Sequence, residues 1–154
     1  MSRYYLDTSA LVKRYVDETG SNWLRTLTAP DQNALLFISR MTIVEVISAF
    51  ARRLRDGSLT REEFVAARDA FRGDCLDEYR VMPPTLEIVN LACALLERYP
   101  LRAYDAIHLS TALDAHEFLS SHSHLSLTFL SADERLNQAA VAEGLPIDNP
   151  NLHP

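Results

Sequence analysis

The sequence predicts an α/β fold in which a central parallel β-sheet has helices on both faces. Short apolar runs typical of buried strands alternate along the chain with longer segments whose apolar residues recur at helical spacing. Parallel strands need helices as crossovers and as cover for both faces of the sheet, so this alternation indicates an α/β/α arrangement. The length of 154 residues, without a linker-like segment, fits one domain spanning 1–154.

In the N-terminal half, each expected strand leads into a helix. The apolar run at 35–39 is bounded in the way buried strands are, and Gly57 ends the helical pattern that follows it. In order, the expected elements are a strand at 3–7, a helix opening at Thr8–Ser9, a helix from Gly20–Ser21 to Leu27, a turn at Pro30–Asp31, a strand at 35–39 and a helix at 42–55.

In the C-terminal half, capping residues and prolines mark the starts of helices. Thr60 and Glu63 have the form of a capping box, and Pro83–Pro84 end a strand before a helix. In order, the expected elements are a helix from Thr60 towards Tyr79, a strand at 79–82, a helix ending before Pro100, a helix at 104–119, a polar loop at Ser120–Ser126, a strand at 127–131, a helix at 133–143 and a last strand beginning at 144–147.

Composition excludes several classes of protein. The formal net charge of -6 argues against non-specific coating of DNA, which needs a basic face. The apolar runs are far shorter than the roughly 20 residues of a membrane span, and no signal-peptide pattern is present. Cys75 and Cys93 are isolated, which excludes a zinc ribbon or a disulfide scaffold. We expect reduced, mostly buried thiols in a cytoplasmic protein.

Four acidic residues differ from the others because they lie among apolar neighbours at strand ends or helix starts. Asp7 closes the first strand, and Glu45 lies in the first turn after the second strand. Asp105 opens a helix, and Asp133 follows the strand at 127–131. The carboxyl ends of parallel strands face one edge of the sheet, where ligands bind, so we expect all four acids near that edge.

Structural explanations compete with a catalytic one for most of these acids. Thr42 with Glu45, and Ser131 with Glu134, have the form of capping boxes. Asp105 and Asp133 could simply complement the dipoles of the helices that begin there. Asp7 is harder to explain in this way, because an aspartate at an apolar strand end carries a desolvation cost. Four converging carboxylates would also repel each other and raise their pKa values unless cations or protons lay between them. An all-oxygen site of this kind suits Mg²⁺ or Mn²⁺.

Four short segments resemble, in order, those of the PIN-domain nucleases. They are Asp7-Thr8-Ser9-Ala10-Leu11, Glu45 in a Thr-x-x-Glu helix start, Asp105-Ala106-Ile107-His108 and Ser131-Ala132-Asp133-Glu134-Arg135-Leu136. The resemblance extends from about Arg3 to Pro146 and is strongest to the VapC-type toxins of type II toxin–antitoxin systems. It implies a PIN-like fold, Mg²⁺- or Mn²⁺-dependent endoribonuclease activity, a homodimer, and a cognate VapB-type antitoxin that blocks the site.

The resemblance also implies roles for individual residues. Asp7, Glu45, Asp105 and Asp133 match the acidic quartet that binds metal and is catalytic, and Asp133 matches the member that varies most. Ser9 matches the hydroxyl residue beside the first aspartate. Ser131 stands where the family commonly has threonine, and the loop expected at Ser120–Ser126 is longer and more polar than is usual there.

Other polar residues have two explanations each. His108 lies three residues after Asp105 and is either a metal ligand or, as we favour, a packed and hydrogen-bonded histidine. His122 and His124 form a His-x-His pair for which we favour a solvated position. Three cations could bind substrate phosphates, with ordinary surface charge as the favoured alternative for each: Lys13, Arg14 and Arg40. We assign four aromatic residues to the core or to a dimer interface: Trp23, Phe50, Phe64 and Phe71.

Two functions remain in competition. The first is a hydrolase that cleaves RNA phosphodiester bonds at carboxylate-bound metal, with the helices at 42–55 and 60–79 as the antitoxin groove. The second is a catalytically weak, PIN-like protein-binding module whose acids are structural caps. Order-specific motifs for acyl transfer, dinucleotide binding and P-loops are absent from the sequence.

Overall fold

Five parallel strands form a single sheet in the order β3-β2-β1-β4-β5, so β1 lies at its centre. The computed structural model describes residues 1–154. The strands are β1 (Arg3–Leu6), β2 (Leu35–Ser39), β3 (Tyr79–Met82), β4 (Thr128–Leu130) and β5 (Ile147–Asp148). The helices are α1 (Thr8–Leu11), α2 (Ser21–Leu27), α3 (Arg40–Asp56), α4 (Arg61–Asp77), α5 (Leu86–Arg98), α6 (Ala103–Ser123) and α7 (Glu134–Ala142), with short 3₁₀ helices η1 (Val12–Arg14), η2 (Pro30–Gln32) and η3 (Pro150–Leu152).

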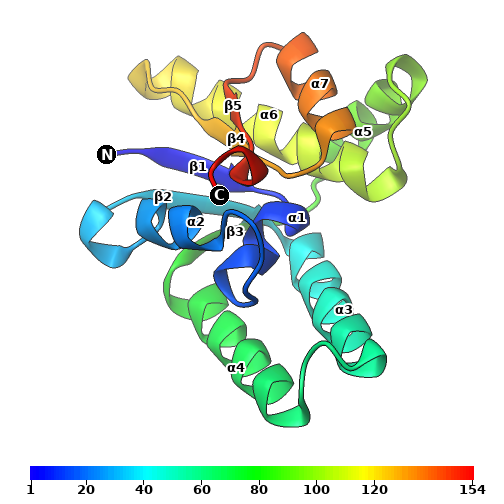
Figure 1. Cartoon of the computed structure of the whole chain (residues 1–154). Coiled ribbons are helices and arrows are strands. Elements are labelled where there is room, and N and C mark those ends of the chain that lie inside the picture. Colours follow the sequence, from blue (N-terminus) through cyan, green and yellow to red (C-terminus); the bar gives the residue numbers. More distant parts are fainter.

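The two faces of the sheet are covered by different halves of the chain. Along β1, Leu6 packs into a core formed with α1 to α4, while Tyr5 packs into a second core formed with α5 to α7. This alternation is the two-residue period of a strand that is buried on both sides. Figure 1 shows the two helical layers above and below the sheet. The predicted α/β/α fold is therefore confirmed.

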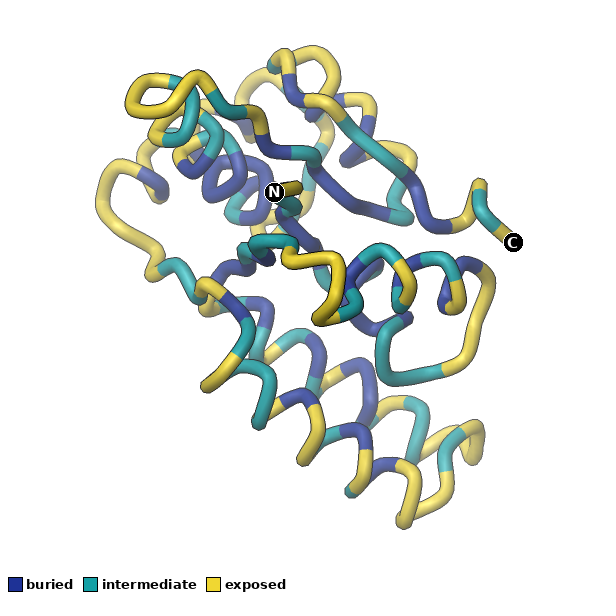
Figure 2. The backbone as a smooth tube through the Cα atoms, turned by 90° about the vertical axis from the view of Figure 1, so that its left-hand side faces the viewer, coloured by how far each residue is buried: buried dark blue, intermediate teal, exposed yellow.

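Helices α3 and α4 form a hairpin that extends beyond the sheet (Figures 1 and 2). Gly57, at φ +82°, ends α3 in the left-handed conformation that favours glycine. Thr60 and Glu63 then cap α4 reciprocally, as the sequence predicted: Thr60 Oγ1 accepts from the Glu63 amide, and Glu63 Oε2 accepts from the Thr60 amide. Phe50, Phe64 and Phe71 are buried in the core between the hairpin and the sheet, which confirms their assignment.

Two of the differences from the predicted boundaries have clear local causes. Helix α3 begins at Arg40 because Ser39 is its N-cap, with Ser39 Oγ accepting from the Met41 amide. Thr42 is therefore inside the helix, and the capping box predicted for Thr42 and Glu45 is wrong. The loop predicted at Ser120–Ser126 starts later than expected, at His124, since α6 continues through Ser123.

The extra turn of α6 has local causes that the polar composition of this segment conceals. The rings of Phe118 and His122 stack at 4.4 Å, four residues apart, which supports a helical turn. His124, at φ +53°, then ends the helix by donating its amide to the Leu119 and Ser120 carbonyls. His122 and His124 are exposed, as predicted, although His122 lies in a helix.

The two cysteines differ in burial, and neither is fully buried. Both cysteines are free, but Cys75 is half-buried and Cys93 is exposed, so the prediction of mostly buried thiols is wrong. Cys93 lies on the outer face of α5, away from the buried residues of that helix.

None of the helices combines the length and apolar character needed to cross a bilayer.

Candidate active site

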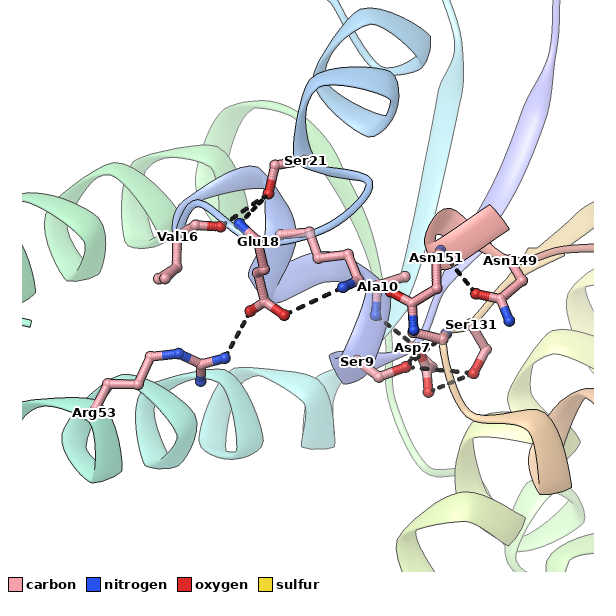
Figure 3. Close-up of polar contacts among 12 residues, drawn as sticks. Asp7, Ser9, Ala10, Val16, Glu18, Ser21, Arg53, Ser131, Asn149 and Asn151 are labelled. Carbon is pink, nitrogen blue, oxygen red and sulfur yellow. Dashed lines mark hydrogen bonds and ion pairs between the residues drawn. The ribbon is translucent and has the colours of Figure 1, made fainter. Parts of the chain in front are cut away.

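Asp7 follows β1 and is almost completely buried, with 4% of its surface exposed. Its Oδ1 atom accepts a hydrogen bond from the Ala10 amide at 3.0 Å, which makes Asp7 the N-cap of α1. Two hydroxyl groups complete its surroundings: Ser9 Oγ donates to Oδ1 at 2.8 Å, and Ser131 Oγ donates to Oδ2 at 3.0 Å (Figure 3). Three hydrogen bonds therefore hold the carboxylate in place.

The same two serines join the ends of β1 and β4. Ser9 Oγ accepts from the Ala132 amide at 2.9 Å, and Ser131 Oγ accepts from the Asp133 amide at 3.0 Å. Each hydroxyl thus has one acceptor on Asp7 and one donor from the segment that follows β4. This arrangement fixes the direction of both hydroxyl protons and holds the Asp7 carboxylate in one orientation.

The pKa of Asp7 is raised above the ordinary value of an aspartate. Burial is the largest cause, and the nearby His108 and the hydrogen bonds from Ser9, Ala10 and Ser131 act in the opposite direction. Repulsion within the acidic quartet, which the sequence led us to expect as the cause, is not among the main contributions. The unfavourable feature of the site is therefore a desolvated carboxylate and not a crowd of carboxylates.

Glu45, on α3, is held by a buried histidine from α6. His108 is 2% exposed, and its Nε2 lies 2.6 Å from Glu45 Oε1 and 3.3 Å from Thr8 Oγ1. Its Nδ1 lies 2.8 Å from the Tyr5 hydroxyl. Because a carboxylate only accepts, His108 Nε2 carries a proton and donates it to Glu45, while Nδ1 shares a hydrogen bond with the Tyr5 hydroxyl. The packed, hydrogen-bonded interpretation of His108 is confirmed, and the contact orients Glu45 as well.

Asp105 and Asp133 are half-buried and lie at helix N-termini. Asp105 Oδ2 accepts from the Arg102 amide at 3.1 Å at the start of α6. Asp133 is the N-cap of α7, since its Oδ1 accepts from two amides of the first turn, at 3.0 and 3.2 Å. The capping box predicted for Ser131 and Glu134 is wrong, because the Ser131 hydroxyl turns towards Asp7.

All four acids line one polar cavity of about 620 Å³. It lies beyond the carboxyl ends of the central strands, where the sequence placed the acids. No three acidic, histidine or cysteine side chains lie close enough together to hold one ion in this structure. The quartet shares a cavity, but two of its members are turned towards helix amides, and their role as metal ligands stays a prediction.

The oxygen atoms of the cavity suit a hard divalent cation. Three of the four carboxylates keep one oxygen that has no hydrogen-bond donor in the protein: Glu45 Oε2, Asp105 Oδ1 and Asp133 Oδ2. Oxygen donors of this kind, free of sulfur, are those that Mg²⁺ and Mn²⁺ prefer. All three of these side chains are half-buried and line the same cavity.

The three cations for which substrate contact was the alternative to ordinary surface charge have different surroundings. Lys13 lines the cavity and is buried, so the surface-charge interpretation of this residue is wrong. Arg14 is turned away from the cavity and binds Glu78 at 3.1 Å and the Tyr79 hydroxyl. Arg40 is exposed and does not line the cavity, which agrees with ordinary surface charge.

The sequence interpretation missed several residues that line the cavity. Arg52 and Arg53 lie seven and eight residues after Glu45 on α3, a spacing of two helical turns that places them along the same face. This spacing could have identified them. Asn151 also lines the cavity, but it follows the last strand and no local pattern points to it.

The chain matches a known family and is similar to known proteins over its whole length. The PIN domain family model matches residues 4–142. The chain is 30% identical over 154 residues to ribonuclease VapC45 of Mycobacterium tuberculosis, and the alignment covers all of both chains.

Solved structures show the same fold at lower sequence identity. Mycobacterium tuberculosis VapC20, described as a Sarcin-Ricin loop cleaving toxin, has a TM-score of 0.66 at 17% identity, with 98% of this chain and 99% of that chain covered. VapBC2 from Rickettsia felis, bound to a DNA fragment from its promoter, has a TM-score of 0.63 at 15% identity, with 95% and 97% covered.

Proposed function

The chain belongs to the PIN domain family, and from this premise we propose that it is a metal-dependent endoribonuclease that serves as the toxin of a toxin–antitoxin pair. Asp7, Glu45, Asp105 and Asp133 are the proposed metal-binding and catalytic residues, with Ser9 and Ser131 in support. The observation that carries the proposal is the burial of Asp7 at the end of the central strand. The fold accepts a carboxylate whose burial raises its pKa, at a position where a neutral serine or asparagine would cap α1 equally well.

The residues around the acids have definable tasks. Ser9 and Ser131 orient the Asp7 carboxylate, and His108 orients Glu45 while its other nitrogen is fixed by Tyr5. A bound Mg²⁺ or Mn²⁺ ion would supply Lewis-acid stabilisation of phosphate oxygens and a water of lowered pKa. The names of the M. tuberculosis relatives, a ribonuclease and a toxin that cleaves the Sarcin-Ricin loop, support RNA as the substrate.

The test of this activity is cleavage of a structured RNA by the purified protein. We expect cleavage with Mg²⁺ or Mn²⁺, none in EDTA, and recovery when metal is restored. Asp7→Asn, purified in the same way, controls for contaminating nucleases. Cleavage that persists in EDTA, or cleavage by the variant at the wild-type rate, would contradict the proposal.

A second function is favoured by one feature of the site. Asp105 and Asp133 cap helices, and no three metal-binding side chains are grouped closely, as expected of a binding module whose acids are structural. That function does not explain the burial of Asp7. Absence of cleavage with every RNA and metal tried, by a correctly folded protein, would favour it.

The antitoxin partner is supported by structural neighbours that are toxin–antitoxin complexes. The α3–α4 hairpin and the cavity beside it are the proposed docking region, where a basic side chain could pair with the acids. We expect the product of a small neighbouring reading frame to co-purify with the chain and to inhibit cleavage.

We also expect a homodimer, which light scattering would test.

A further inference from the structure

The cavity that holds the acids also contains a compact group of cations. Lys13 and Arg53 both bind Glu18, and all three residues line the cavity. Glu18 and Arg53 lie on one side of Figure 3, whereas Asp7, Ser9 and Ser131 lie on the other. We call Lys13, Glu18 and Arg53 the basic triad; its formal charge is about +1, because one carboxylate faces two cations.

Lys13 is the only lysine in the chain, and its side chain is 4% exposed. Its Nζ lies 3.2 Å from Glu18 Oε2, which is its only acceptor in the protein. An ammonium group has three N–H donors, so two of them have no acceptor within the chain. Burying such a group is costly unless its donors are satisfied, and these donors lie at a cavity that is polar.

Glu18 holds the two cations together in a fixed place. Its Oε1 atom accepts from Arg53 Nη2 at 2.6 Å, while Oε2 accepts from Lys13. Its main chain is fixed in turn, because the Glu18 amide donates to Ser21 Oγ at 2.9 Å and that hydroxyl donates to the Val16 carbonyl at 3.0 Å (Figure 3). Glu18, on the loop between η1 and α2, therefore holds both cations in one orientation.

We propose that Lys13 and Arg53, aligned by Glu18, form a binding site for a backbone phosphate of the RNA strand, next to the phosphate at the acidic residues. This inference rests on the proposed ribonuclease function and adds to it the place where the strand is held. Ammonium and guanidinium groups form strong, charge-assisted hydrogen bonds with phosphate oxygens. Contacts to phosphate position a strand without reading its bases, so the basic triad contributes affinity and register but no sequence preference.

A purely structural salt bridge makes a different prediction. If the triad only ties η1 to α3, removal of one cation lowers the stability of the protein and leaves its affinity for RNA unchanged. If the triad binds phosphate, the affinity falls and its dependence on salt weakens. RNA binding measured in EDTA, where the proposed cleavage does not proceed, separates these outcomes.

The first experiment compares Arg53→Gln with Arg55→Gln, a matched charge change on the same helix. Arg55 is exposed and does not line the cavity. Binding of a fluorescein-labelled single-stranded RNA is measured by anisotropy over a range of salt concentrations. We expect Arg53→Gln to weaken binding about tenfold at low salt and to reduce the slope of log K against log salt by about 0.7, the value for one phosphate contact to a single strand. Equal binding and equal slopes for the two variants would overturn the phosphate site.

Glu18→Gln removes a negative charge from the basic triad, whereas Arg53→Gln removes a positive one, so the two variants should change RNA affinity in opposite directions. The amide keeps a hydrogen-bond acceptor for one cation but removes the negative charge that competes with phosphate. We expect RNA to bind at least about threefold more tightly than to the wild type, together with a lower melting temperature. A variant that loses stability and binds RNA no more tightly would indicate a purely structural triad.

The single lysine permits a direct observation in the unmutated protein. Selective ¹⁵N labelling of lysine gives one side-chain ammonium signal, which belongs to Lys13. We expect this signal to shift on addition of the same RNA in EDTA. An unchanged signal at saturating RNA would overturn the proposal. If the wild type cleaves RNA but fails these tests, only the phosphate site is wrong; if it neither binds nor cleaves RNA, the ribonuclease function fails as well.

Discussion

Asp7 and Asp133 both cap a helix beside the same cavity, but their surroundings differ. Asp133 is half-buried and accepts hydrogen bonds only from the amides of α7, whereas Asp7 is buried and accepts from two hydroxyl groups as well as an amide. The half-buried cap at Asp133 shows that a helix start beside this cavity does not need a fully buried charge. Helix capping accounts for the position of Asp133, whereas it does not account for the buried charge of Asp7, which we propose holds metal.

The largest expected effect is that of Asp7→Asn on cleavage. The substitution keeps the volume of the side chain and an acceptor for the Ala10 amide, but it removes the charge that would hold metal. We expect the rate to fall at least about 100-fold, which is a loss of about 2.7 kcal/mol of transition-state stabilisation. Initial rates at saturating Mg²⁺ measure this. A variant that retains more than about a tenth of the wild-type rate would show that Asp7 is not a catalytic ligand.

Asp133→Asn should lower the cleavage rate less than Asp7→Asn does, in line with the different burial of the two acids. Asparagine is as good an N-cap as aspartate, so the melting temperature should stay the same. We expect cleavage to fall about tenfold, because one peripheral negative charge is lost. Rates and melting curves are to be measured on the same preparation. A loss equal to that of Asp7→Asn would mean that the two acids are equivalent despite their different burial.

The orientation of Glu45 depends on Tyr5, because Tyr5 contacts His108 and His108 contacts Glu45. Tyr5→Phe removes the hydroxyl and leaves His108 Nδ1 buried without its partner. We expect the free energy of unfolding to fall by about 1–2 kcal/mol, since an unpaired buried polar atom costs about that much. The Mg²⁺ concentration for half-maximal cleavage should also rise, because the His108 ring loses one of the two contacts that orient it towards Glu45. Unfolding in urea and a Mg²⁺ titration measure the two effects; a stability loss alone would limit Tyr5 to packing.

The smallest effect expected is on the metal-free stability of Asp7→Asn. Burial raises the pKa of Asp7 in the folded state, so the folded protein holds more protons than the unfolded chain. The destabilising contribution is absent at low pH and grows as pH rises through the unfolded and then the folded pKa. Asp7→Asn also loses one acceptor for a serine hydroxyl, which shifts its melting temperature by the same amount at every pH. In EDTA, the melting temperature of Asp7→Asn relative to the wild type should therefore rise from acid to neutral pH. A difference that does not change with pH would contradict this account of the site.

The framework of the fold was predictable because its causes are local. The apolar run of β2, the capping box of Thr60 and Glu63 and the left-handed Gly57 act within a few residues. The extra turn of α6 was missed because the stacking of Phe118 on His122 outweighs the polar composition of that segment. The start of α3 was placed too late because Ser39 is both the last residue of β2 and the cap.

For the site, the placement of the acids was predictable, as was the position of Asp105 and Asp133 at helix starts, but the contacts of Asp7 and Glu45 were not. Strand ends in a parallel sheet share one edge, which is why Asp7 and Glu45 could be placed at one cavity. The directions of Asp105 and Asp133 depend on which amides are free at each helix start, and the basic triad joins residues 13, 18 and 53 from three separate segments. Contacts of that kind leave no periodic pattern in a sequence.

The most direct test of the central claim is Mn²⁺ binding to metal-free protein, measured by calorimetry for the wild type, Asp7→Asn and Asp133→Asn side by side. The account predicts that the wild type binds Mn²⁺, that Asp7→Asn loses at least about tenfold in affinity, or about 1.4 kcal/mol, and that Asp133→Asn loses less. Equal affinities for the wild type and Asp7→Asn would contradict it, because the buried carboxylate would then have no part in holding metal.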